Sequence, residues 1–417
     1  MNVVNEKLMD RVLDEANLNH ACKAVKANAG GPGIDHMSVE ELTDHVRQHW
    51  SKIEVKLREG TYKPAPVRPV KIPKPNGGTR ELGVPTVLDR LIQQALYQVL
   101  SGIFEPRFSE HSYGFRPGRS TQDAMNAAQK TVQEGKDWIV DIDIAAFFDN
   151  VNHDRLMTRI GQVIRDKTVL RLIGRYLRAG KLEDGKLIRT GKGTPQGGPL
   201  SPLLANIYLH DLDIELEKRG LSFVRYADDC NIYVGSERAA QRVIDSVSRW
   251  IEKNLKLQVN ADKSGTGRPW ERKFLGFQIT EKGKIRVAPE SLERLKERVR
   301  NTFCARRNLT SNQLRDEWKE RITGWWSYFR LAEWRYDIFD LEGWIRRHIR
   351  KCFWLRWHNK KGRLNALKRL GITGKSLKVA GSSRGAWRIA RSHVMHHALN
   401  NKRLRKTGFL MPSDLAG

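Results

Sequence analysis

The chain has 417 residues, of which 39% are hydrophobic and 29% are charged, so it can bury a substantial core and is not intrinsically disordered. Lysine and arginine outnumber aspartate and glutamate by 75 to 47, which gives a formal net charge of +28. This charge favours a polyanionic partner, with nucleic acid as the first candidate. The sequence has no apolar run of about 18 residues and no signal peptide, so we expect a cytoplasmic protein with no membrane partner.

The positive charge is concentrated in the C-terminal part of the chain. Residues 291–417 carry 30 basic and 10 acidic side chains, and from Ile345 onward there are 19 lysines and arginines with Asp414 as the single acid. A segment with so large an excess of positive charge is difficult to fold compactly without a polyanion beside it. We therefore expect the C-terminal region to bind nucleic acid most tightly.

Apolar residues with helical spacing dominate the N-terminal part of the sequence. They predict one helix over residues 3–28, which stops at a glycine cluster, and a second helix that a capping box at Ser38 opens and that ends near Arg58. Two further helices are expected over residues 86–104 and 121–133.

Residues 62–85 are rich in proline and basic side chains and predict a β-hairpin whose turn is residues 75–78. Lys74 and Arg80 flank this turn. Cationic side chains beside a glycine-rich turn can make charge-assisted hydrogen bonds to a triphosphate. The alternative is an ordinary charged hairpin that faces solvent.

A short β-rich run, residues 138–144, carries two acids, Asp141 and Asp143, on one face of a strand. A buried strand rarely accommodates a carboxylate without a partner. If Asp143 is buried, it therefore needs a metal ion or another cation; the alternative is a solvated strand end. Helices over about 154–180 and a hairpin around Gly185 are expected next.

Two loops add candidate binding residues. The loop at 111–120 combines glycine, proline and aromatic residues with Arg116, which suits contact with a nucleic-acid backbone, although the loop could simply close a turn. The loop at 191–202 precedes an apolar helix, and its glycines permit the close approach of a ligand. Gln196 in this second loop could contact an incoming base.

Residues 223–234 predict two strands joined by a tight turn with Asp228 and Asp229 at its tip. Adjacent like charges beside an apolar hairpin are costly unless a cation lies there, and a divalent metal ion is the natural candidate. An ordinary exposed Asp-Asp turn is the alternative.

The rest of the chain changes from mixed to helical character. An amphipathic helix is expected over residues 236–254, followed by strands near 257–259 and 274–279 and by a boundary at 283–289. Beyond residue 290 the pattern is helical and includes eight of the twelve tryptophans. We expect most of these tryptophans in the core of a small helical bundle.

Three carboxylates, Asp143, Asp228 and Asp229, could converge from two adjacent strands and hold two Mg²⁺ ions, with Mn²⁺ as the alternative ion. Two such ions lower the pKa of an attacking hydroxyl and stabilise a leaving pyrophosphate. With a cationic hairpin to neutralise a triphosphate, the arrangement indicates nucleotidyl transfer.

Six blocks of sequence resemble, in the same order, the signature blocks of the group II intron-encoded reverse transcriptase/maturase family, in particular its compact bacterial class C type. The resemblance extends over nearly the whole chain. The blocks are residues 72–75, 113–119, 194–202, 225–229, 274–277 and 324–325.

This resemblance implies an α+β fold of the right-hand polymerase type. Fingers and a palm with an antiparallel sheet are expected over residues 1–285. An α-helical thumb, the maturase X region, is expected over residues 286–360, and a basic helical DNA-binding region over residues 361–417.

The resemblance also implies roles for individual residues. The three aspartates become the catalytic metal ligands, with Ile144 beside Asp143 as a further metal- and nucleotide-binding position. Phe148 becomes the gate against ribonucleotides, Arg116 lines the nucleotide pocket or the template path, and Lys263 contacts the nucleotide. The other residues expected to bind the dNTP are Lys74, Arg80 and Gln196.

The implied function is RNA-directed DNA polymerisation of intron RNA into cDNA, combined with maturase action in splicing and retrohoming. Implied partners are the group II intron RNA, an RNA template with a DNA or RNA primer, target DNA and dNTPs, in a bacterial cytoplasmic ribonucleoprotein. The oligomeric state stays open between monomer and dimer.

Longer family members end in a Cys/His-rich endonuclease domain. The four cysteines of this chain, Cys22, Cys230, Cys304 and Cys352, are too scattered to form such a cluster. Priming from a nascent DNA strand or a single-stranded target is therefore expected. The alternatives are a splicing cofactor whose polymerase activity is dispensable, and a free-standing bacterial reverse transcriptase in defence or DNA repair.

The charge distribution predicts strongly salt-dependent binding to nucleic acid. Between about 50 and 200 mM salt, the affinity of the chain for an RNA–DNA duplex should fall by a factor of about 10³ or more, because each neutralised phosphate releases counterions. Fluorescence anisotropy titrations measure this slope. An affinity that stays constant over this range would contradict the prediction.

Overall fold

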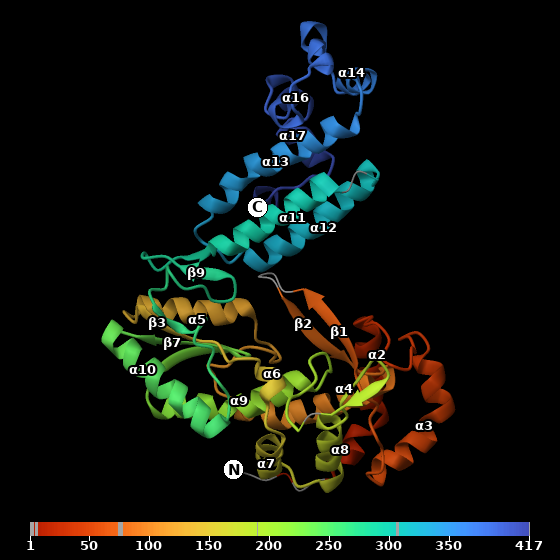
Figure 1. Ribbon diagram of the computed structural model, residues 1–417, viewed down its shortest axis with the longest axis vertical. Coiled ribbons are helices and arrows are strands. Elements are labelled where there is room, and N and C mark those ends of the chain that lie inside the picture. The colour runs from red at the N-terminus through yellow and green to blue at the C-terminus, as the bar shows by residue number, and fades with distance from the viewer. Residues whose placement is uncertain (1–3, 5–6, 74–77, 190, 306–307, 417) are drawn as a thin grey trace. The chain divides into compact units, whose positions relative to one another are not determined.

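The computed structural model describes residue 4 and residues 7–73, 78–189, 191–305 and 308–416 (Figure 1). It divides into two compact units, Met1–Arg268 and Pro269–Gly417. The expected boundary after residue 285 differs from this division, because residues 269–285 belong to the second unit. The assignment of the expected domains to parts of a polymerase stays a prediction.

The N-terminal part of the first unit is helical, as expected, but its first helix is interrupted. Asp14 accepts hydrogen bonds from the backbone N–H groups of Ala16 and Asn17, so a new helix begins at Glu15. The next helix begins at Leu42, after the expected start at Ser38, whose N–H donates to the Glu41 carboxylate. These helices are α1 (Leu8–Val12), α2 (Glu15–Ala27) and α3 (Leu42–Arg58).

The expected hairpin and the two helices after it are confirmed. Strands β1 (Arg68–Pro73) and β2 (Thr79–Val84) pair in antiparallel fashion, and the expected turn at 75–77 lies outside the described residues. Helix α4 (Val87–Phe104) begins where the Thr86 side chain accepts from the N–H of Asp89, and α5 (Thr121–Gln133) begins at a capping box.

A four-stranded antiparallel sheet forms the centre of the first unit, in the order β6-β7-β3-β8. Alternate residues of its central strands, Val140 and Ile142 of β3 and Cys230 and Ile232 of β7, are completely buried. Helix α10 packs against β3, β7 and β8, and α5 packs against β6 (Figure 1). The strands are β3 (Trp138–Ile142), β6 (Ser222–Tyr226), β7 (Asp229–Val234) and β8 (Gly265–Gly267).

Strand β8 was not expected from the sequence. A strand was expected near residues 257–259, where the structure has only a single bridge between Ile144 and Val259. The remaining elements of the unit follow the expected order. They are η1 (Glu105–Arg107), α6 (Phe147–Asn150), α7 (His153–Val163), α8 (Lys167–Leu177), β4 (Lys181–Glu183), β5 (Lys186–Ile188), α9 (Ser201–Lys218), α10 (Glu237–Trp250) and η2 (Ile251–Leu255).

The second unit starts with a small strand pair and continues as helices. Strand β9 (Phe277–Ile279) lies within the expected strand at 274–279, and it pairs with β10 (Ile285–Val287), which occupies the expected boundary at 283–289. The helices that follow are α11 (Pro289–Ala305), α12 (Ser311–Phe329), α13 (Tyr336–Arg356), α14 (Lys360–Arg369), η3 (Gly374–Gly381), α15 (Ala386–Ile389), α16 (His393–Ala398), α17 (Asn401–Lys406) and α18 (Pro412–Leu415).

The C-terminal segment packs on the helices that precede it. The Glu342 carboxylate in α13 accepts hydrogen bonds from the backbone N–H and the hydroxyl of Ser413, and Trp318 Nε1 in α12 donates to the Leu410 carbonyl at 2.8 Å. The Arg347 guanidinium lies 5.2 Å from the centre of the Trp387 ring. Contacts with other parts of the second unit therefore help to hold the basic segment in a folded conformation.

Four of the eight tryptophans beyond residue 290 are buried in the core, fewer than the expected majority, and three more are half-buried. Trp318, Trp325, Trp326 and Trp354 are buried, and Trp334 is 43% exposed. In the described part of the chain, no helix combines the length and the apolar content that crossing a membrane requires.

Candidate active site

The β6–β7 hairpin carries the two adjacent acids at one end of the sheet. Because Tyr226 pairs with Asp229, the turn consists of Ala227 and Asp228, and Asp229 is the first residue of β7. Ala227 has φ = 57°, in the left-handed region that a residue with a Cβ adopts only at some cost. The expectation that both acids lie at the tip is therefore corrected: only Asp228 does.

The segment at 111–114 lies directly behind this turn. Tyr113 N donates to the Arg225 carbonyl at 2.8 Å, and Asn206 Nδ2 donates to the Gly114 carbonyl at 2.8 Å. A Cβ atom on Gly114 would lie 2.3 Å from the Ala227 nitrogen, so only glycine allows this close approach. The strained turn therefore rests against a second stretch of backbone.

A buried ion pair holds the hairpin from inside. The side chains of Arg225 in β6 and Asp213 in α9 are completely buried. Arg225 Nε and Nη2 donate to the two Asp213 carboxylate oxygens at 2.6 and 2.5 Å. Its other donors reach Ser112 Oγ, Asn206 Oδ1 and, at 2.9 Å, the Ala227 carbonyl in the turn. The guanidinium group thus connects α9, the 111–114 segment and the turn itself.

Asp143 follows the last residue of the adjacent strand β3. Its backbone N–H donates to Ser264 Oγ at 2.9 Å, and its carbonyl accepts from Asn260 N at 2.9 Å. Its carboxylate oxygen Oδ2 lies 3.7 Å from Lys263 Nζ. The loop between η2 and β8 therefore fixes the backbone of Asp143 and supplies a cation beside its carboxylate.

Ile144 lies next to Asp143 with its side chain buried, so only its backbone could contact a ligand. The bridge to Val259 uses the carbonyl of Asp143 and the N–H of Ala145. The carbonyl of Ile144 makes no hydrogen bond to any residue that the structure describes.

The three aspartates are electrostatically coupled. Desolvation, the charge of Asp228 and the charges of Asp141 and Asp143 raise the pKa of Asp229. Desolvation also raises the pKa of Asp228; Asp143 adds to the increase, whereas Arg80 and Arg225 oppose it. Water partly screens Asp229, which is exposed, but the neighbouring negative charges still disfavour the ionisation of Asp228 and Asp229.

Arg80 and Gln196 meet between the β1–β2 hairpin and the 191–202 loop. Arg80 Nε donates to Gln196 Oε1 at 2.5 Å, and Gly83 N donates to the Gln196 carbonyl at 2.7 Å. Arg80 is exposed and is also close enough to Asp228 to affect its pKa. The structure thus brings Arg80, Gln196 and the acidic turn together.

Phe148 is held beneath the same loop. Its ring is buried and packs at an angle of 74° against Phe147, and its carbonyl accepts from Thr194 N at 2.7 Å. His153 Nε2 donates to the Gly193 carbonyl at 2.6 Å. These bonds tie the turn after β3 to the loop that carries Gln196.

Arg116, which was expected to line the nucleotide pocket or the template path, points into the protein instead. The residue is buried, and its guanidinium group donates to the Glu105 carboxylate at 2.8 Å and to the carbonyls of Ser109 and Ser112. Because these contacts occupy its donors inside the protein, the structure gives Arg116 a role in folding the 111–114 segment. Lys74 lies outside the described residues.

Sequence reasoning missed the pairing of Arg225 with Asp213. Arg225 was noticed only as part of a resemblance, and Asp213 was not singled out. The available signal was the helical position of Asp213: Leu209 lies four residues before it and Leu216 three residues after it on the same face, so its carboxylate is expected to be buried and to need a partner.

The described residues contain no group of three or more His, Cys, Asp or Glu side chains placed to hold a metal ion. The side chains of three aspartates are nevertheless chemically suited to binding a metal ion. The side chains of Asp143, Asp228 and Asp229 offer only carboxylate oxygens, which Mg²⁺ prefers, and a cation beside them would offset the desolvation and the neighbouring charges that raise the pKa of Asp228 and Asp229.

Comparison with family models identifies the class of protein to which this chain belongs. A family model of the reverse transcriptase (RNA-dependent DNA polymerase) matches residues 72–279, and a model of the maturase-specific domain of group II introns matches residues 292–371. The first match contains the end of β1, the whole of β2, the four-stranded sheet and all three aspartates. These residues form a reverse transcriptase domain with an α+β fold.

Individual relatives narrow the class. The chain is 47% identical to the group II intron-encoded protein LtrA of Lactococcus lactis subsp. cremoris, over 58% of this chain and 52% of that protein. It is 29% identical to the protein YkfC of Escherichia coli (strain K12), over 76% of this chain and 93% of that protein. The chain belongs to the group II intron-encoded reverse transcriptase/maturase family.

The match to LtrA is partial, and the match to a solved structure is weak. The chain spans about half the length of LtrA. A chain of the solved partial Cas6-RT-Cas1–Cas2 complex is 26% identical, over 60% of this chain and 44% of that chain, with a TM-score of 0.39. This structural likeness is too weak to add to the assignment.

The buried ion pair predicts a large difference between two aspartates of helix α9. Asp213→Asn leaves the Arg225 charge buried without a counter-charge and should lower the free energy of unfolding by about 3–5 kcal/mol. Asp211→Asn removes a partly exposed pair with Arg159 and should cost about 1 kcal/mol or less. Urea unfolding measures both values, and equal costs would contradict the role given to Arg225.

The acidic cluster predicts a pH-dependent gain in stability for Asp229→Asn. The pKa of Asp229 is raised in the folded protein, so the ionised carboxylate lowers stability as the pH rises above the unfolded value of about 3.9. Without divalent ions, the variant should therefore melt at the wild-type temperature near pH 4 and above it near pH 8.

In the same melting experiment, added Mg²⁺ should stabilise the wild-type protein more than the variant, because the variant has one carboxylate fewer to attract the ion. Asp245→Asn, at an exposed position of α10, is the matched control and should follow the wild type. A variant that is less stable than the wild type near pH 8 would contradict the repulsion described above.

Proposed function

We propose that this protein is an RNA-directed DNA polymerase that copies group II intron RNA into cDNA and acts as a maturase for that RNA. The observation that carries the proposal is the coupled group of Asp143, Asp228 and Asp229, which lies within the residues that match the reverse transcriptase family. In this proposal the sheet of the first unit is the palm, the β1–β2 hairpin belongs to the fingers and α11–α13 form the thumb.

The three aspartates are the proposed ligands of two Mg²⁺ ions, together with the carbonyl of Ile144. Bound divalent ions supply the positive charge that lowers the pKa of an attacking 3′-hydroxyl and stabilises the leaving pyrophosphate. The repulsion among the carboxylates supports this assignment, because a nearby cation removes it.

The surrounding residues are proposed to position the dNTP. Arg80 is proposed to neutralise the triphosphate, and Gln196, which accepts a hydrogen bond from Arg80, is proposed to line the nucleotide pocket. Lys263, next to Asp143, is proposed to contact the nucleotide, and Phe148 is proposed to exclude a 2′-hydroxyl. We do not propose a nucleotide contact for Arg116, because its guanidinium is occupied inside the protein.

A maturase role without polymerase activity is the second candidate. The match of residues 292–371 to the maturase-specific domain favours it, as does the charge of the second unit, which has 35 basic and 13 acidic side chains. Splicing of a cognate intron RNA at low Mg²⁺, with and without the protein, tests this role separately. Protein-independent splicing would contradict it.

Primer extension tests the polymerase proposal. On an RNA template with Mg²⁺, Asp228→Asn should reduce extension by about 100-fold or more, because a pre-positioned group that stabilises the transition-state charge is lost. Asp245→Asn on α10 is the control and should extend at the wild-type rate. If Asp228→Asn extends a primer as fast as the wild type, the site assignment is wrong.

A further inference from the structure

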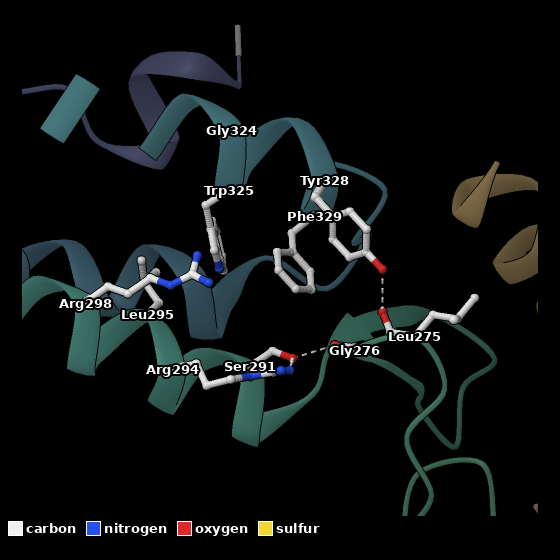
Figure 2. Close-up of a pocket in the computed structure, with 10 residues that line it drawn as sticks. All are labelled: Leu275, Gly276, Ser291, Arg294, Leu295, Arg298, Gly324, Trp325, Tyr328 and Phe329. Atoms are coloured by element: carbon white, nitrogen blue, oxygen red, sulfur yellow. Dashed lines mark hydrogen bonds between the residues drawn. The ribbon is translucent and has the colours of Figure 1, made fainter. Parts of the chain in front are cut away.

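A cavity of about 360 Å³ lies within the second unit, between helices α11 and α12 and the turn at Leu275 and Gly276 (Figure 2). Helix α11 contributes Arg294 and Arg298, and α12 contributes Gly324, Trp325, Tyr328 and Phe329. A cavity of this volume is within the range of small-molecule sites. None of the residues proposed above for polymerase chemistry lines it.

The charge of this cavity is positive and uncompensated. Arg294 and Arg298 are one helical turn apart, on the same face of α11, and no acidic side chain lines the cavity. Arg294 Nη2 donates to Ser291 Oγ at 2.8 Å, and Arg298 makes no hydrogen bond to any residue the structure describes. Figure 2 shows the Arg298 guanidinium reaching toward Trp325. Two adjacent guanidinium groups without a carboxylate favour an anionic ligand.

The opposite wall is aromatic and fixed in place. The rings of Trp325 and Phe329 are 4.8 Å apart, and Tyr328 stacks on Phe277 at 5.7 Å with an interplanar angle of 21°. The Tyr328 hydroxyl donates to the Leu275 carbonyl at 3.0 Å, as the dashed line in Figure 2 shows. A rigid aromatic wall opposite two arginines matches a planar base attached to a phosphate.

Gly324 supplies the open space between these walls. It lies in the interior of α12, where glycine is less favourable than alanine. A Cβ atom at this position would meet nothing within 4 Å, so packing in the described structure does not require glycine. The same is true of Gly343 in α13, which does not line the cavity and therefore provides a matched control.

We propose that this cavity binds one unpaired nucleotide of a nucleic-acid strand. The base lies against the aromatic wall over Gly324, and its phosphate contacts Arg294 and Arg298. The proposal rests on the nucleic-acid function proposed above and adds a site for a nucleotide outside the duplex. Both an RNA strand and a DNA strand can supply this ligand.

The test uses the whole chain, without dNTPs, and an RNA–DNA hybrid duplex with a single bulged 2-aminopurine. One arm places the bulge in the RNA strand and the other places it in the DNA strand. The wild type should quench the fluorescence of the bulged base and bind the bulged hybrid about 10-fold more tightly than the fully paired one in at least one arm. The arm that shows the effect identifies the strand.

Two variants make the test specific. Gly324→Ala should lose the preference for the bulge while its thermal stability stays equal or rises, because alanine favours the helix. Gly343→Ala should gain stability in the same way and keep the preference. Arg298→Gln should weaken binding of the bulged hybrid and reduce the salt slope by about one counterion.

The inference is overturned if the wild type binds bulged and paired hybrids equally, or if Gly324→Ala keeps the full preference. Its failure is distinguishable from failure of the polymerase proposal. Primer extension on a fully paired primer–template reports on the aspartates, whereas bulge binding without dNTPs needs no catalysis.

Discussion

The completely buried pair of Arg225 and Asp213 is the constraint on which the acidic turn of the reverse transcriptase domain depends. Burying two charges is costly, and the cost is offset only if every donor and acceptor is satisfied. Here all five guanidinium donors have partners, one of which is the Ala227 carbonyl in the acidic turn. The pair therefore fixes a strained turn that two repelling carboxylates would otherwise loosen.

The other parts of the site meet at this turn. Strand β3 brings Asp143 beside the hairpin, and the following loop adds Lys263. Arg80 approaches from a separate hairpin and is bonded to Gln196, so residues far apart in sequence form one charged surface. The site thus combines excess negative charge on the sheet with positive charge on the loops around it, which suits a metal-bound triphosphate.

Local signals in the sequence predicted much of this arrangement. The alternating strand that precedes Asp143 and the apolar hairpin with two adjacent acids predicted the positions of the three carboxylates, and the repulsion among them agrees with positions close to one another. Arg225 was not predicted, because a buried arginine is recognisable only when its partner in another helix is known. Strand β8 was missed for a similar reason, since residues 265–267 have little strand propensity and pair only because β3 offers an open edge. Arg116 was misplaced because arginine in a glycine-rich loop resembles a ligand-binding residue until its internal acceptors are seen.

The central claim is that Asp143, Asp228 and Asp229 together hold the metal ions of a polymerase. The most direct measurement is anomalous diffraction from crystals of the protein with Mn²⁺, an RNA template, a chain-terminated primer and a dNTP. The account predicts anomalous peaks within about 2.0–2.3 Å of carboxylate oxygens from all three aspartates. Peaks bound by other residues, with these three carboxylates free of metal, would contradict it.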